Sequence, residues 1–370
     1  MSVGPIIPPS GGPPSGGPPS GGIGGVSSAA GSPQAGGGAG ATAQAPAATG
    51  VVAGPQADLA TLIGADVAAQ DSLAPLLADL AVALQTGAMP AAAQATAQQV
   101  LALQVPLDEA VTGQTLRAAV VQSGLFLEAG LAASAQAPHD LSAAPYLAGD
   151  LKALLLRLPL ELTAQSEASA QRAAQSALVS QDAAHRRTTS RPPPPVAGGP
   201  TSAQPAARAS IGAGMDAASQ REALRHEAHA ALARLELLQL ASLPKPQAPT
   251  RWAFDLPVAS EQGPAMAQFE ISREAPQGGA ADTEPVWRAR FTLDLDGAGP
   301  VHAEVALHGA RTRVTLWAEQ EPMRTRLDDG RGDLTAALKG PDDADAAVRV
   351  LPGAPPTPAA AAGQLIDRTS

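Results

Sequence analysis

The 370-residue chain contains 37 Gly and 36 Pro, whereas aromatic residues make up 2% and charged residues 16% of it. A packed core draws on aromatic and branched side chains, so this composition argues against one uniformly packed globule and predicts long disordered stretches. The absence of Cys excludes disulfides and thiolate chemistry, and the net charge of −10 disfavours nucleic-acid binding.

Residues 1–57 form the most biased stretch of the chain. They contain no charged residue, and the repeat Pro-Pro-Ser-Gly-Gly begins at Pro8, Pro13 and Pro18. Glycine raises the entropic cost of ordering, and proline blocks helices and strand ladders. The sequence therefore predicts a disordered Gly/Pro-rich tail, with a proline-rich ligand for a recognition domain as the alternative.

Residues 58–165 are rich in Ala and Leu and predict a helical region. The apolar spacing and the breakers place helices over 72–87, 92–104, 107–122 and 146–158. Phe126 and Tyr146 are the only aromatic residues before Trp252. A core with two rings and many alanines is thin, so we expect these helices to pack loosely. The uncharged run from Leu80 to Leu107 contains five Gln and two Pro, which argues against membrane insertion.

Residues 166–215 are polar, include the run Pro192–Pro195, and predict a linker. Residues 216–250 return to helical spacing, with an apolar face that ends before Pro244.

Residues 251–351 change in character, because period-two alternation appears together with all three Trp and most Phe. Strands are expected around Trp252–Val258, Phe269–Ile271, Trp287–Leu295, Val301–Leu307, Val314–Ala318 and Val348–Leu351. Asp296–Pro300 and His308–Arg311 contain the turn residues. Met323, Leu327, Leu334 and Leu338 share one face of a helix over 320–339, which Gly330 and Gly332 weaken.

The predicted fold class is therefore α+β. A small C-terminal antiparallel sheet with one packed helix over 251–351 follows a largely disordered and partly helical N-terminal region, and 352–370 forms a tail.

Candidate catalytic and metal-binding groups are few. His226 and His229 have a spacing that a metal site could use, but no further ligand cluster accompanies them. His302 and His308 occupy the polar parity of one strand, so we expect both to face solvent. Nucleophile-elbow and phosphate-loop motifs are absent. We therefore expect neither an enzyme nor a bound cofactor or metal.

The C-terminal pattern resembles that of flagellar hook-length control proteins. The similar residues are Trp252–Leu256, Leu293–Leu295, Gly299–Leu307, Val314–Glu319 and the spaced Arg324, Leu327, Leu334 and Leu338. Ser123–Glu128 and Leu365–Thr369 are also similar to segments of that group. Ala298 departs from the family pattern, which has Leu there, and Lys339–Asp343 departs from its step into the last strand.

The resemblance implies an exported molecular ruler, cytoplasmic until it leaves through the flagellar type III apparatus. Its C-terminal domain would bind the cytoplasmic domain of the export-gate switch protein and change export from hook to filament subunits. Hook and hook-cap proteins would be further partners. The expected contact residues are Gly299, Pro300, Val301, Arg324, Leu327, Leu334 and Leu338. The alternative is a non-enzymatic scaffold or spacer with a small β-rich binding module.

Overall fold

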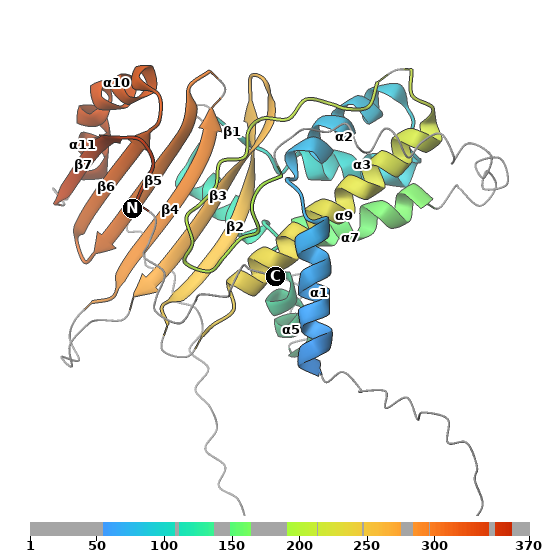
Figure 1. The fold of residues 1–370 in the computed structure, drawn as a ribbon, viewed down its shortest axis with the longest axis horizontal. Coiled ribbons are helices and arrows are strands. Elements are labelled where there is room, and N and C mark those ends of the chain that lie inside the picture. Colours follow the sequence, from blue (N-terminus) through green and yellow to red (C-terminus); the bar gives the residue numbers. More distant parts are fainter. Residues whose placement is uncertain are drawn as a thin grey trace, which may run out of the picture. The chain divides into compact units, whose positions relative to one another are not determined.

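A seven-stranded sheet organises the C-terminal half of the chain. The computed structural model describes residues 55–107, 111–136, 149–163, 191–212, 214–245, 248–274, 284–295, 297–339 and 345–356. Within them the strands are β1 (Val105–Pro106), β2 (Thr250–Ser260), β3 (Gly263–Glu274), β4 (Val286–Leu295), β5 (Gly299–His308), β6 (Arg311–Ala318) and β7 (Ala346–Pro352). They lie side by side in chain order (Figure 1). β2 to β6 form an antiparallel meander, and β1 and β7 flank it in parallel.

The turns of the meander lie where the glycines predict them. Leu295 pairs with Gly299, and His308 pairs with Arg311. Gly297, Gly299 and Gly309 have φ values of 76°, 69° and 56°. Only glycine adopts this left-handed region at little cost, so these positions fix both hairpins.

The strand register gives the sheet one apolar and one polar face. The apolar face is crossed by Trp252, Phe254 and the residues that pair with them, and three stacked ring pairs run along it: Trp252–Trp287, Phe254–Phe269 and Phe269–Phe291. The polar face has the opposite parity and includes Asp255, Glu270, Arg290, Glu304 and Arg349. Side chains alternate between faces along a strand, so each face is continuous across the meander.

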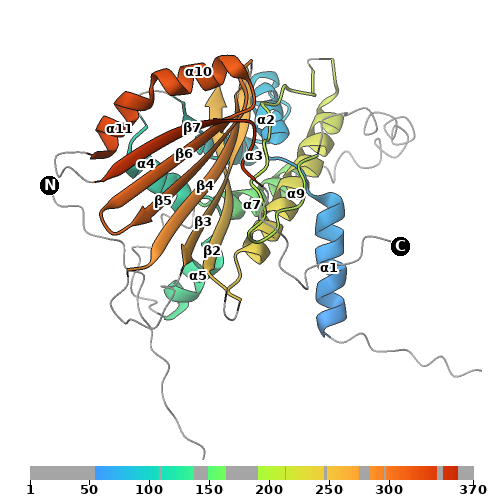
Figure 2. The same cartoon turned by 60° about the vertical axis from the view of Figure 1, so that its left-hand side comes forward.

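Helices occupy both faces of the sheet. The first group is α1 (Pro55–Ala69), α2 (Ala74–Thr86), α3 (Ala91–Leu101), α7 (Leu151–Thr163) and α9 (Ala217–Ala241). It adjoins the polar face near β2 and β3 (Figure 1). α4 (Gly113–Val121), α10 (Glu321–Asp329) and α11 (Arg331–Lys339) are seen beside the apolar face in Figure 2, and α5 (Leu127–Gln136) follows α4.

The main core lies within the first group of helices and, among the described residues, contains no aromatic side chain. Its largest fully buried members are mostly leucines from α2, α7 and α9, with Met266 of β3 joining them from the sheet; the leucines are Leu76, Leu77, Leu80, Leu154, Leu155, Leu158, Leu162 and Leu224. Small residues such as Ala93 and Ala228 let the helices approach closely. The expectation of loose packing is therefore wrong for these helices, because leucine replaces the missing rings.

An extended segment, residues 191–212, joins the helices to the sheet; we call it the strap (Figure 1). At its start the Pro192 carbonyl accepts a hydrogen bond from Gln70, and at its end Ser210 and Ile211 donate to the buried carboxylate of Asp79. In between, Gln204 bridges to Met266. The strap is most of the described part of the expected 166–215 linker.

The predicted α+β class is confirmed, with two differences. The expected antiparallel sheet is mixed, because the edge strands β1 and β7 pair in parallel with their neighbours. The expected helix over 320–339 is two helices, α10 and α11, that meet at Gly330. Glycines at 330 and 332 weaken a continuous helix, and the break lets both helices contact β7. The expected disordered tail over 1–57, apart from 55–57, lies outside the described residues, as do most of the 352–370 tail and residues 164–190.

Among the described helices, none alone has the length and hydropathy needed to cross a bilayer. Leu59–Ala69 and Ala74–Thr86 meet the criteria only as a pair bent by 59°. Leu76, Leu77 and Leu80 of the second helix belong to the leucine core.

Candidate partner-binding surface

Some of the expected contact residues lie in or beside a small apolar cluster at one end of the sheet. Val301 of β5, Ala318 of β6 and Met323 of α10 are buried together, and Ala298 and Leu327 pack against them. This cluster seats α10 on the apolar face. The structure thus brings Val301 and Leu327 together, with a primary role in packing.

Gly299 lies beside this cluster, where the chain enters β5. A Cβ atom at this position would lie 2.7 Å from Gln320 Nε2, the residue that caps α10. Its φ of 69° also disfavours any other residue. Gly299 therefore lets the β4–β5 turn approach the start of α10 closely.

Arg324 lies half-exposed on α10, next to the cluster. Its guanidinium pairs with Glu321, one helical turn earlier, through two hydrogen bonds. The bond from Arg324 lowers the pKa of Glu321, and the same bond raises that of Arg324. Both groups are open to solvent, so the pair orients a charge at the surface and adds little stability.

Leu334 and Leu338 lie on α11, away from the Val301 cluster. Both are half-buried, and α11 packs against β7. The opposite side of the two helices is exposed and charged, with Arg326, Asp329 and Asp333 among its residues. The apolar spacing seen in the sequence therefore marks the packing side, and the free side is charged.

His302 corrects the expectation that both histidines of β5 face solvent. Its side chain is buried on the polar face: Nδ1 lies 2.8 Å from Thr292 Oγ1, and Nε2 lies 3.5 Å from Glu319 Oε1. Thr292 in turn contacts Thr201 of the strap. The alternation placed His302 on the correct face, but it contains no signal that this part of the face is covered. His308 is exposed as expected.

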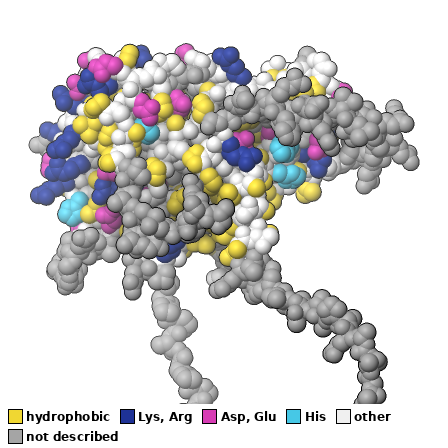
Figure 3. Space-filling view, in the orientation of Figure 1, with side chains coloured by type: hydrophobic (Ala, Val, Ile, Leu, Met, Phe, Trp, Pro, Cys, Tyr) yellow, Lys and Arg dark blue, Asp and Glu magenta, His cyan; other side chains and the backbone are white. Residues whose placement is uncertain are grey.

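A band of arginines crosses the polar face and was not anticipated. Arg288 and Arg290 pair with Glu304, and Arg290 also approaches Glu270. Two further arginines, Arg313 of β6 and Arg349 of β7, are exposed and have no carboxylate partner among the described residues. Figure 3 shows Lys and Arg side chains gathered over this side of the sheet.

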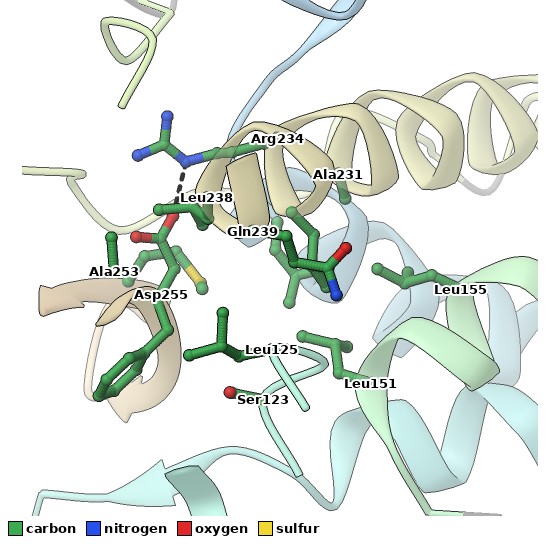
Figure 4. A pocket seen from close by; sticks show the side chains of 14 residues that line it. Ser123, Leu125, Leu151, Leu155, Ala231, Arg234, Leu238, Gln239, Ala253 and Asp255 are labelled. Atoms are coloured by element: carbon green, nitrogen blue, oxygen red, sulfur yellow. Dashed lines mark hydrogen bonds and ion pairs between the residues drawn. The ribbon is translucent and has the colours of Figure 1, made fainter. Parts of the chain in front are cut away.

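A pocket lies between α9, α7 and β2. Leucines of α7 and α9 line it, and the ion pair between Arg234 and Asp255 closes one side (Figure 4). Arg234 Nε lies 2.5 Å from Asp255 Oδ2, and both side chains are less than a tenth exposed. Asp255 Oδ1 and Arg234 Nη2 have no partner among the described residues, and the lining residues given by the structure include no pair of groups suited to acid–base or nucleophilic chemistry.

Among the residues that the structure describes, no three His, Asp or Glu side chains gather as metal ligands, and His226 and His229 are exposed on α9. The region from β4 to β7 consists of sheet strands, a helix pair, a turn and charged surfaces.

Residues 275–353 match the family model described as "Flagellar hook-length control protein FliK". The match spans β4 to β7 with α10 and α11, so it confirms for this region the resemblance inferred from the sequence. The comparisons with curated proteins and with solved structures returned no match.

Proposed function

We propose that this protein is a flagellar hook-length control protein that switches export from hook to filament subunits. The observation that carries the proposal is the family match over 275–353. The matched residues contain the whole of strands β4 to β7 and of helices α10 and α11. In this proposal the region acts by binding the cytoplasmic domain of the export-gate switch protein. The protein resides in the cytoplasm until the flagellar type III apparatus exports it.

The binding surface in this proposal is the free side of α10 and α11 together with the β4–β5 turn. Arg324 supplies an oriented charge there, while Val301, Leu327, Leu334 and Leu338 hold the helices against the sheet. Gly299 supports this arrangement by placing the turn against Gln320.

The part of the chain before β2 acts as the ruler, in contact with hook and hook-cap proteins. Fully extended, residues 1–250 reach at most about 800 Å at roughly 3.3 Å per residue. Helices rise only about 1.5 Å per residue, so α1 to α9 must unfold for the chain to attain that reach.

The test is hook length by electron microscopy in a strain that lacks the gene. We expect long, uncontrolled hooks without filaments, and complementation should restore control. Removing residues 164–190 should then shorten hooks by roughly 90 Å if that stretch is extended during measurement. Normal hooks and filaments in the deletion strain would refute the proposal and favour a scaffold protein.

The proposed binding surface has its own test in the same strain. Arg324→Glu should restore hook length control poorly, because it places like charges beside Glu321 and reverses the surface charge. The matched control is Arg225→Glu on α9, whose arginine also pairs with a glutamate three residues away. If both variants complement the deletion equally well, Arg324 is not part of the proposed binding surface.

A further inference from the structure

The strap crosses the polar face of β2–β4 in one particular conformation. Its residues 196–199 form a turn in which the Gly199 amide donates to the Val196 carbonyl at 2.8 Å. Gly198 occupies the third position of this turn with φ of 75°. A type II turn requires this geometry and favours glycine there.

Two buried side chains of the sheet hold the strap at this turn and just after it. The Gly198 amide donates to Glu270 Oε2 at 2.8 Å, and the Ser202 amide and hydroxyl donate to Gln268 Oε1 at 2.5 and 3.0 Å. Glu270 and Gln268 are each only 5% exposed. Because buried polar groups without partners are costly, the sheet needs a segment with these donors at this spacing.

The same contacts select particular residues in the strap. A Cβ atom at Gly198 would lie 2.3 Å from Arg251 Nη1, and Arg251 is itself held by Glu270 at 3.2 Å. A Cβ atom at Gly199 would lie 3.0 Å from the Val196 carbonyl oxygen. Position 201 is less constrained: its carbonyl accepts from Thr292 at 3.3 Å, and among the described residues its amide donates no hydrogen bond. The site on the sheet that holds the strap, which we call the seat, therefore fits the pattern Gly-Gly-Pro-x-Ser, as in residues 198–202.

The sequence contains this pattern twice more, at 11–15 and at 16–20. In both copies x is Pro, which needs no amide hydrogen, and the two preceding residues are Pro-Ser in place of Val-Ala. We propose that the groove across β2–β4 is a recognition site for extended Gly-Gly-Pro-x-Ser segments. Residues 196–202 fill it within each molecule, and the repeats of a second molecule are its alternative ligand. This inference does not depend on the proposed hook-length function.

Disulfide trapping tests the proposal directly, because the chain has no Cys of its own. Thr292→Cys places a thiol beneath position x, where the hydroxyls of Thr201 and Thr292 are 2.6 Å apart. Full-length Thr292→Cys is mixed with full-length Pro14→Cys, which carries a thiol at position x of the first repeat. Mixed disulfide dimers should form at least fivefold faster than with Pro33→Cys, which lies outside the repeats. Equal rates would overturn the proposal.

Two companion variants separate recognition from chance collision. Gly11→Ala/Gly12→Ala in the Pro14→Cys chain should abolish the rate advantage, because the seat excludes Cβ atoms. Gly198→Ala in the Thr292→Cys chain should increase the rate, because it loosens the resident strap. If the rate of mixed disulfide formation is unchanged in both variants, the inference is contradicted.

A binding measurement covers the case in which Thr292→Cys fails to fold. A fluorescent peptide with the sequence of residues 9–20 is titrated with the full-length Gly198→Ala protein, whose fold is checked by circular dichroism. We expect at least tenfold weaker binding when the four glycines of the peptide are replaced by alanine. Failure of the glycine peptide to bind the folded variant would overturn the proposal.

Discussion

Arg234→Ala offers the strongest test of how the helices and the sheet are joined. The Arg234 guanidinium on α9 contacts Asp255 of β2 at 2.5 Å, Gln70 at 3.1 Å and the Pro193 carbonyl of the strap at 3.2 Å. Its removal leaves the Asp255 carboxylate buried, with only the Gln204 amide at 2.9 Å as a partner. Breaking a buried ion pair in this way costs about 3–5 kcal/mol.

Folded domains typically have a free energy of unfolding of about 5–15 kcal/mol, so a loss of this size is easily measured. The assay is urea unfolding of the full-length protein, followed by tryptophan fluorescence and by far-ultraviolet circular dichroism. All three Trp lie in the sheet, whereas most helical signal comes from α1 to α9, so the two probes report on different layers. Both transitions should move together to lower urea.

The matched control is Arg225→Ala on the same helix, where the arginine pairs with Glu222 at the surface. Its cost should stay below about 0.5 kcal/mol. Replacing both buried partners with apolar residues, Arg234→Met/Asp255→Leu, should recover much of the lost stability. A shift in circular dichroism without a shift in fluorescence would refute the reasoning, since it would mean that the two layers unfold separately.

Three further outcomes follow from the packing and the charges. Gly299→Ala should cost about 1–3 kcal/mol in thermal unfolding and exceed Gly297→Ala, which has a similar φ but open space around its Cβ position. Leu158→Ala should cost about 2–5 kcal/mol, and Leu160→Ala, at a position 70% exposed, should cost almost nothing; similar values would argue against the leucine core. Burial alone would raise the pKa of Glu128, but the hydrogen bond and charge of its lysine partner lower it, so its stabilising contribution is present above pH 4.5 and is lost on acidification. Glu128→Gln should therefore flatten the stability profile below that pH, and an unchanged profile would exclude the ion pair.

The sheet was largely predictable because its signal is local. Alternation along 287–295 and 301–307, with glycines between them, located β4, β5 and their turn to within a few residues. β1 was missed, since Val105–Pro106 is too short for any periodic pattern. The position of the C-terminal helical segment was predicted correctly, but its division into two helices was not. The spacing of apolar residues alone does not tell whether Gly330 bends a helix or ends it.

The coverage of the polar face was not predictable. His302 belongs to a polar row by parity, and its burial depends on packing across the sheet and on a strap that lies far upstream in the chain. Composition marks the strap as a linker because it is rich in Pro, Gly and Ser. Its ordering comes from Glu270, Gln268 and Asp79, which are ordinary charged or polar residues in sequence.

The strands lie in the sheet in the same order as in the chain, and this has a mechanical consequence. When a chain is pulled from its N-terminal side, α1 to α3 and then the two-residue edge strand β1 come under tension first. Each later strand becomes the new edge once its predecessor has left, so hydrogen bonds open one after another, as in a zipper. No strand must be drawn out from between two others. The sheet can therefore be unravelled from that end with low force at every stage, whatever its resistance to heat or urea.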